Sequence, residues 1–84
     1  MSAKLSQVQT WVLRGKKRKD VSHVIIAHDT FDDSNYPVYV TRDKSVRDEV
    51  ARLEAKKMTR VEEVYSLRMS LSAQLAAPHV MNLD

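Results

Sequence analysis

The sequence predicts an α+β protein with a small antiparallel sheet of three to four strands and one main helix packed on a face. Three observations predict this class: β-branched runs bounded by turn residues, a hydrophobic period of two near residue 65, and one segment that combines an N-cap pattern with helical spacing. The 84 residues are 43% hydrophobic and 30% charged, which fits a single globular domain over 1–84.

The first two predicted strands are 5–13 and 21–28. The first is rich in Val, Thr and Trp, and the second is a β-branched apolar run. Residues of these types are enriched in strands. The polar run 15–20 separates the two segments, so we expect a hairpin with a basic tip.

A loop over 29–37 and a third strand over 37–41 follow. Asp, Ser, Asn and Pro cluster in the loop, where each favours turn geometry. Pro37 then opens the third strand at a position where a missing N–H group is tolerated. We expect this strand to pair with the strand 21–28.

A helix is predicted over 45–57. Ser45 supplies an N-cap hydroxyl and Asp48 a carboxylate three residues later, which matches a capping box. Val46, Val50 and Leu53 follow at helical spacing and should pack against Val24, Ile26, Val38 and Val40 or their opposite-face neighbours. We expect the other face of the sheet to remain open for a second subunit.

The segment after Lys57 has two interpretations. Tyr65, Leu67 and Met69 alternate with polar residues, which favours a fourth strand over 59–69 in a meander. The absence of Gly and Pro between Pro37 and Pro78 leaves a continuing helix as the alternative. A short helix over 70–77, stopped by Pro78, completes the predicted elements.

The net charge of +3 is unevenly distributed. Residues 1–20 contain six basic side chains and one acidic one, and four of the basic ones form the run 16–19. A surplus in one short run suits an anionic partner, whereas a solvated turn is the alternative. The candidate ligand- or anion-binding residues are Lys16, Lys17, Arg18, Lys19, Arg42, Tyr39 and Trp11.

The aromatic candidates have a competing structural role. Tyr39 would face outward if Val38 and Val40 face the core, and beside Arg42 it would stack on a base while the cation holds a phosphate. Trp11 would add stacking if exposed. Core packing is the alternative for both aromatic residues.

Metal binding and catalysis are not predicted. Asp29, Asp32 and Asp33 lack the alternation and the glycine of a calcium loop, so a turn closed by an Asp side chain is favoured. His23 and His28 are five residues apart on a strand, which places them on opposite faces. We expect His28 to make a polar contact beside the loop. No nucleophile elbow or glycine-rich phosphate loop is present, and no cofactor is expected.

The stretch 28–40, HDTFDDSNYPVYV, followed by 61–67, VEEVYSL, resembles small uncharacterised accessory proteins of tailed bacteriophages. The resemblance implies a factor that binds and inhibits host machinery, including immune effectors or their nucleotide signals. Such a counter-defence protein would act in the cytoplasm of the host cell. The resemblance supplies no functional residue.

The predicted function is therefore non-enzymatic binding that sequesters or blocks a host target, with an anionic nucleotide immune signal as one ligand. The alternatives are an inhibitor of a host protein effector, similar to an anti-CRISPR protein, and a small basic DNA- or RNA-binding protein. A small domain buries a thin core, so we expect a homo-oligomer. No apolar stretch is long enough to span a membrane, and no signal-peptide core follows the first residues.

Overall fold

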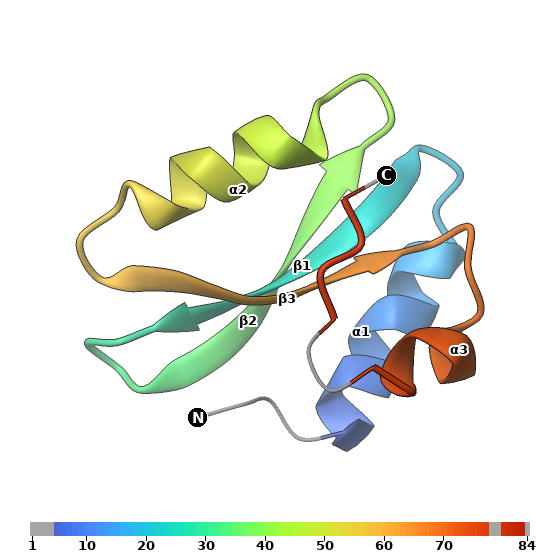
Figure 1. The fold of residues 1–84 in the computed structure, drawn as a ribbon, viewed down its shortest axis with the longest axis horizontal. Helices are drawn as coiled ribbons and strands as arrows, with labels where there is room; N and C mark the ends of the chain where they lie inside the picture. The colour runs from blue at the N-terminus through green and yellow to red at the C-terminus, as the bar shows by residue number, and fades with distance from the viewer. Residues whose placement is uncertain (1–4, 78–79, 84) are drawn as a thin grey trace.

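The computed structural model describes residues 5–77 and 80–83, and these form three helices and three strands (Figure 1). The order along the chain is α1 (Leu5–Lys16), β1 (Val21–Asp29), β2 (Ser34–Thr41), α2 (Val46–Glu54), β3 (Thr59–Ser66) and α3 (Leu71–Leu75). The predicted α+β class is confirmed. No described helix has the length and apolar character needed to cross a membrane.

The sheet has the strand order β2-β1-β3, and β1 pairs with both neighbours in antiparallel fashion. The expected pairing of β2 with β1 is confirmed. The meander is wrong, because β3 pairs with β1 instead of β2. Because both are antiparallel to β1, β2 and β3 end at the same end of the sheet, and α2 connects them.

The predicted strand 5–13 is wrong, because these residues lie in α1. Val8, Val12 and Gly15 are buried at spacings of four and three residues, which is the periodicity of one helix face. Burial of this stripe against the sheet outweighs the strand preference of Val, Thr and Trp. The hairpin with a basic tip is therefore also wrong, and the basic run forms the end of α1 and the turn to β1.

Both faces of the sheet are covered. On one face Val46, Val50 and Leu53 of α2 pack with Ile25, Val40 and Val64. On the other face, Val8 and Val12 of α1 pack with Val24, Ile26, Tyr65 and Val80. Figure 1 shows α2 and α1 on opposite sides of the sheet. The predicted core positions of α2 are confirmed, whereas the open face for a second subunit is wrong.

Several boundaries differ from the predicted ones. β2 begins at Ser34, so Pro37 lies inside the strand instead of at its start. This position is tolerated because β2 is an edge strand. The N-cap is confirmed, since Ser45 Oγ accepts a hydrogen bond from the Asp48 N–H (3.3 Å), but α2 ends at Glu54 instead of residue 57.

The segment after Lys57 is a strand, as favoured, although β3 ends at Ser66 instead of 69. The short helix is confirmed as α3, with Ser70 as its N-cap. The predicted stop at Pro78 lies outside the described residues.

A buried glutamine fixes the end of β3. Gln74 Oε1 accepts from the Ser66 backbone N–H and Gln74 Nε2 donates to the Ser66 carbonyl, both at 2.8 Å. Asn82 Nδ2 donates to the same Oε1 at 2.7 Å. These bonds replace a strand partner where the sheet stops, and they position the residues that follow, including Arg68.

Candidate functional site

A cavity of about 430 Å³ lies at the end of the sheet where β1 begins and where β2 and β3 end. The first residues of α2 form one of its walls. We call it the basic cavity, and its lining residues are Ser22, His23, Arg42, Lys44, Ser45, Val46, Arg47, Arg68 and Leu83. Four of these side chains are cations, and none of the lining residues that the structure describes is a carboxylate, so the basic cavity is suited to an anion.

The cations come from three segments that the topology brings together. Arg42 and Lys44 follow β2, Arg47 lies in the first turn of α2, and Arg68 follows β3. All four residues are exposed, and Arg42 and Arg68 form no ion pair with any described carboxylate. Clustering of like charges raises the local positive potential.

The start of α2 adds to this potential. The first N–H groups of a helix have no acceptor within the helix, and they give its N-terminus a positive partial charge. Ser45 Oγ takes the Asp48 N–H, which fixes the first turn beside the cavity. The basic cavity therefore combines full charges with helix-end dipoles, an arrangement that proteins use to bind phosphate.

His23 contributes a buried polar group to the same wall. Its residue exposure is 8%, and Nδ1 lies 2.8 Å from Ser22 Oγ. Ser22 Oγ in turn donates to the Val40 carbonyl at 3.4 Å, so the hydroxyl is oriented by the sheet. The pair is thereby held in a defined geometry at the base of the cavity.

The carboxylate of Asp43 lies next in sequence to two of the cavity cations but does not line the cavity. Its side chain accepts a hydrogen bond from Thr41 Oγ1. This bond, then the backbone N–H of Asp43 itself and more weakly the Lys44 charge, hold the pKa of Asp43 below its usual value. The carboxylate is therefore ionised at neutral pH and engaged with Thr41.

The structure brings part of the predicted site to this end of the molecule. We call Lys16, Lys17, Arg18 and Lys19 the basic turn, although Lys16 is the last residue of α1. The Arg42 N–H donates to the Asp20 carbonyl (2.8 Å), which joins the basic turn to the rim of the basic cavity. That these residues bind a ligand stays a prediction.

Tyr39 does not face outward, and Trp11 packs against the core, which was the alternative to a stacking role. Tyr39 is half-buried under α1 and does not face outward, because Val40 packs with α2 and its strand neighbour therefore points to the opposite face. Its hydroxyl donates to the Trp11 carbonyl at 3.1 Å, and the Arg18 guanidinium lies 5.7 Å from the ring centroid. Tyr39 thus contacts Arg18 instead of forming a stack beside Arg42, and Trp11 packs against the core.

Sequence reasoning missed most of the cavity residues, namely Ser22, His23, Lys44, Ser45, Val46, Arg47, Arg68 and Leu83. They come from four separate segments, and only the pairing of β1 with both neighbours brings them together. One signal was present in the sequence, because Arg42, Lys44 and Arg47 flank the N-cap Ser45. Basic residues around a helix start are a usable sign of an anion site.

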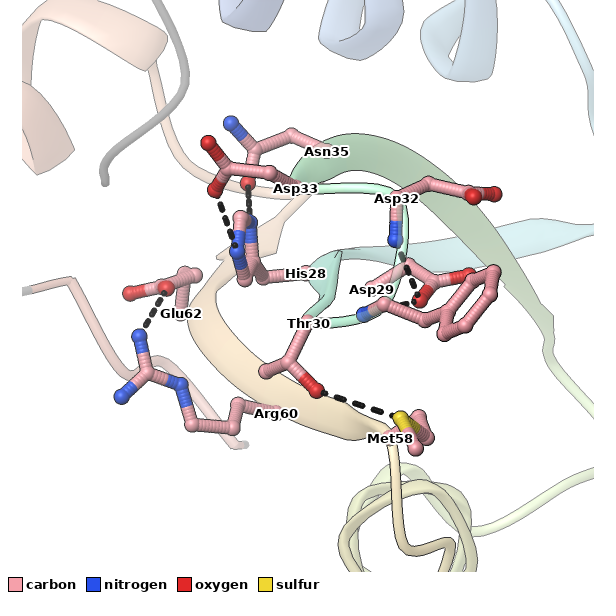
Figure 2. A network of polar contacts seen from close by, with 10 residues as sticks. His28, Asp29, Thr30, Asp32, Asp33, Asn35, Met58, Arg60 and Glu62 are labelled. Carbon is pink, nitrogen blue, oxygen red and sulfur yellow. Dashed lines mark hydrogen bonds and ion pairs between the residues drawn. The ribbon is translucent and has the colours of Figure 1, made fainter.

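The opposite end of the sheet contains the three aspartates of the β1–β2 connection, shown in Figure 2. We call residues 28–35 the hairpin tip. Asp29 Oδ1 accepts from the Phe31 N–H (2.8 Å) and the Asp32 N–H (3.3 Å), which confirms the turn closed by an Asp side chain. In the described part of the chain, no group of three His, Cys, Asp or Glu residues is placed to hold a metal ion.

His28 has the polar-contact position that the sequence favoured. Its Nε2 lies 3.2 Å from Asp33 Oδ1, and its Nδ1 lies 2.9 Å from Asn35 Oδ1 (Figure 2). Asp33 lies in the turn between β1 and β2 and adopts a positive φ of 53°. Its contact with His28 spans this turn. The side chains of the hairpin tip therefore bond mainly to one another.

Comparison with known proteins gives no relative from which a function can be transferred. The chain matches no protein-family model, no curated protein and no solved structure. The resemblance to phage accessory proteins stays a prediction. The chemistry of the basic cavity is consequently the basis on which a function is assigned.

Proposed function

We propose that this protein is a non-enzymatic binding protein whose basic cavity holds a phosphate-bearing ligand of nucleotide size. The observation behind the proposal is the cluster of four cations around a cavity at the N-terminus of α2. Four of the 14 lysines and arginines of the chain thus line one cavity. The nucleotide-sequestering version of the predicted function needs a site of this kind.

The volume and chemistry fit such a ligand. Ligand sites have volumes of roughly 300–1,000 Å³, and the cavity of about 430 Å³ falls within this range. Arginine guanidinium groups bind phosphate oxygens in a bidentate manner, and three of the four cations are arginines. Val46 and Leu83 add apolar surface against which a sugar or base can pack.

Within this proposal the protein captures its ligand and does not turn it over. Origin in a phage and action on a host target stay predictions, as does the inhibition of a protein effector. A ligand recovered unchanged after incubation with the protein supports capture. Conversion of the ligand by the pure protein contradicts the non-enzymatic part of the proposal.

The test is calorimetric titration with inorganic phosphate and with ATP at low salt, using two matched variants. Arg60 is the second residue of β3, and Arg68 lies two residues after the other end of this strand. Both residues are exposed. Arg68→Ala should weaken binding about tenfold or more, because a hydrogen bond to a charged group contributes about 1.5–3 kcal/mol. Arg60→Ala, which lies outside the cavity, should leave the affinity unchanged.

Two results would contradict the proposal. The first is that neither phosphate nor ATP binds the wild-type protein in a saturable manner. The second is that the two arginine variants lose affinity equally. The second result would show that only the overall charge matters. Thermal unfolding of both variants, recorded beside the titrations, confirms that each compared protein is folded.

A further inference from the structure

The Arg18 side chain has two partners, the Tyr39 ring on the face of the sheet that α1 covers and the carboxylate of Asp20. Its guanidinium lies 5.7 Å from the centre of the Tyr39 ring, within the range of a cation–π contact. Its Nη2 also donates to Asp20 Oδ2 at 3.2 Å. The side chain nevertheless remains 48% exposed, so much of its surface faces solvent.

The ring beneath Arg18 is itself fixed. Tyr39 donates its hydroxyl to the Trp11 carbonyl, and its ring packs closely on α1 where Gly15 lies. A Cβ atom at Gly15 would be 3.2 Å from Tyr39 Cε1, which shows how close the helix comes. Arg18 thus lies over a tyrosine that packs on α1.

The cations of the basic turn continue those of the basic cavity around the end of the sheet. The hydrogen bond from the Arg42 N–H to the Asp20 carbonyl joins the two segments. Lys16, Lys17 and Lys19 are exposed beside Arg18, and Arg42 lines the cavity. Tyr39 and Arg42 are three residues apart, which corresponds to about 10 Å along a strand.

We propose that the basic cavity and the basic turn together bind a single-stranded nucleic acid, with one phosphate in the cavity and one base stacked on the Arg18 guanidinium. This inference rests on the proposed function, because it uses the same phosphate site. The two sites lie on different faces of the sheet end, so a ligand that contacts both must be a chain with several phosphates. Guanidinium planes stack on bases of any sequence, so the binding is sequence-tolerant.

The expected salt dependence follows from counterion release. The logarithm of the binding constant falls with the logarithm of the salt concentration by roughly 0.7 per phosphate contacted in a single strand. The four cavity cations together with the basic turn would contact several phosphates. We therefore expect a markedly steeper salt dependence for an oligonucleotide than for a nucleotide held in the cavity alone.

The test compares ATP with a fluorescein-labelled single strand of ten thymidines, by calorimetry and by fluorescence anisotropy respectively. Arg18→Lys keeps the charge and removes the planar group. It should weaken oligonucleotide binding about fivefold or more, because stacking of one base contributes roughly 1–3 kcal/mol. The same variant should leave ATP binding unchanged, and Arg60→Lys at the far end of β3 should change neither.

The outcomes separate this inference from the proposed function. If ATP binds but the oligonucleotide binds no more tightly, or if Arg18→Lys matches the wild type, the nucleic-acid inference is overturned and the cavity proposal stands. If neither probe binds, both are overturned. Tighter oligonucleotide binding that depends on Arg18 and Arg68, while ATP binding depends on Arg68 alone, supports both.

Discussion

The two ends of the central strand β1 each hold a buried histidine, but the polar and charged side chains around the two histidines are arranged differently. At the hairpin tip, His28 contacts Asp33 and Asn35, and Asp29 caps two backbone N–H groups. At the other end, His23 lies beside a cavity whose described lining includes four cations. Polar groups that satisfy one another stabilise the fold, whereas gathered like charges need a partner from outside.

The comparison shows why residue type alone does not identify a site. The three aspartates of the hairpin tip are close in sequence and attract attention as metal ligands, yet Asp29 and Asp33 are engaged within the turn. The cavity cations are dispersed over residues 42–68, so the sequence does not mark them as a cluster. The fold shows a difference between the two clusters, because Asp29 and Asp33 have partners within the hairpin tip, whereas Arg42 and Arg68 form no ion pair with a described carboxylate.

The largest expected effect tests the structural role of the hairpin tip. His28→Ala should lower the free energy of unfolding by about 2–3 kcal/mol, because it removes a buried ring and leaves its polar partners without their contacts. Urea unfolding measures this change. Phosphate affinity of the folded variant should equal that of the wild type, and a loss of affinity would contradict the separation of the two ends.

A second variant tests the close packing under the basic turn. Gly15→Ala places a Cβ atom 3.0 Å from Val24 Cγ2 and 3.2 Å from Tyr39 Cε1. Overpacking costs about 1–3 kcal/mol, and the better helix propensity of Ala offsets about 1 kcal/mol of this. We expect a net loss of about 1 kcal/mol in urea unfolding, together with weaker oligonucleotide binding. An unchanged stability would mean that α1 lies farther from the sheet.

A pair of N-caps separates stability from binding. Ser45 caps α2 at the cavity, and Ser70 caps α3 away from it. Replacing either serine by alanine should cost about 1 kcal/mol in unfolding free energy. Only Ser45→Ala should also weaken phosphate binding in calorimetry. An equal loss of affinity in both variants would indicate a general effect of destabilisation.

The smallest expected effect concerns acid. The hydrogen bond from Arg52, and more weakly the Arg52 charge, hold the pKa of Glu49 below its usual value of 4.5. Because the pKa is lower in the folded state than in the unfolded state, the ionised carboxylate stabilises the fold at pH values above the unfolded pKa. This contribution is lost as the pH falls through the folded pKa. The thermal unfolding midpoint of Glu49→Gln should therefore fall less between pH 6 and pH 3 than that of the wild type. A parallel fall in both proteins would contradict this assignment.

The sequence predicted the elements whose local signals agree with their environment. The strand β1, the Ser45 cap and the alternation through Tyr65 all have patterns that packing reinforces. It failed for α1, because Val, Thr and Trp favour strands while the spacing of Val8, Val12 and Gly15 is helical. Tertiary burial decided between these two signals.

The candidate site was only partly predictable for a different reason. Arg42 and the basic turn are visible as charges in the sequence, but Arg68 joins Arg42 only because β2 and β3 flank the same strand. The orientation of Tyr39 depended on the position of α1, which was mispredicted. Non-local pairing is the information that a linear pattern lacks.

Backbone amide shifts during a titration with inorganic phosphate test the central claim most directly. In ¹⁵N-correlated spectra, saturable shifts should concentrate in the residues of the basic cavity, above all in the first turn of α2 and around Arg68. The hairpin tip, residues 28–35, should remain unchanged and serves as the internal reference. Shifts spread evenly over the exposed lysines and arginines, or the absence of saturation, would contradict a phosphate site in the basic cavity.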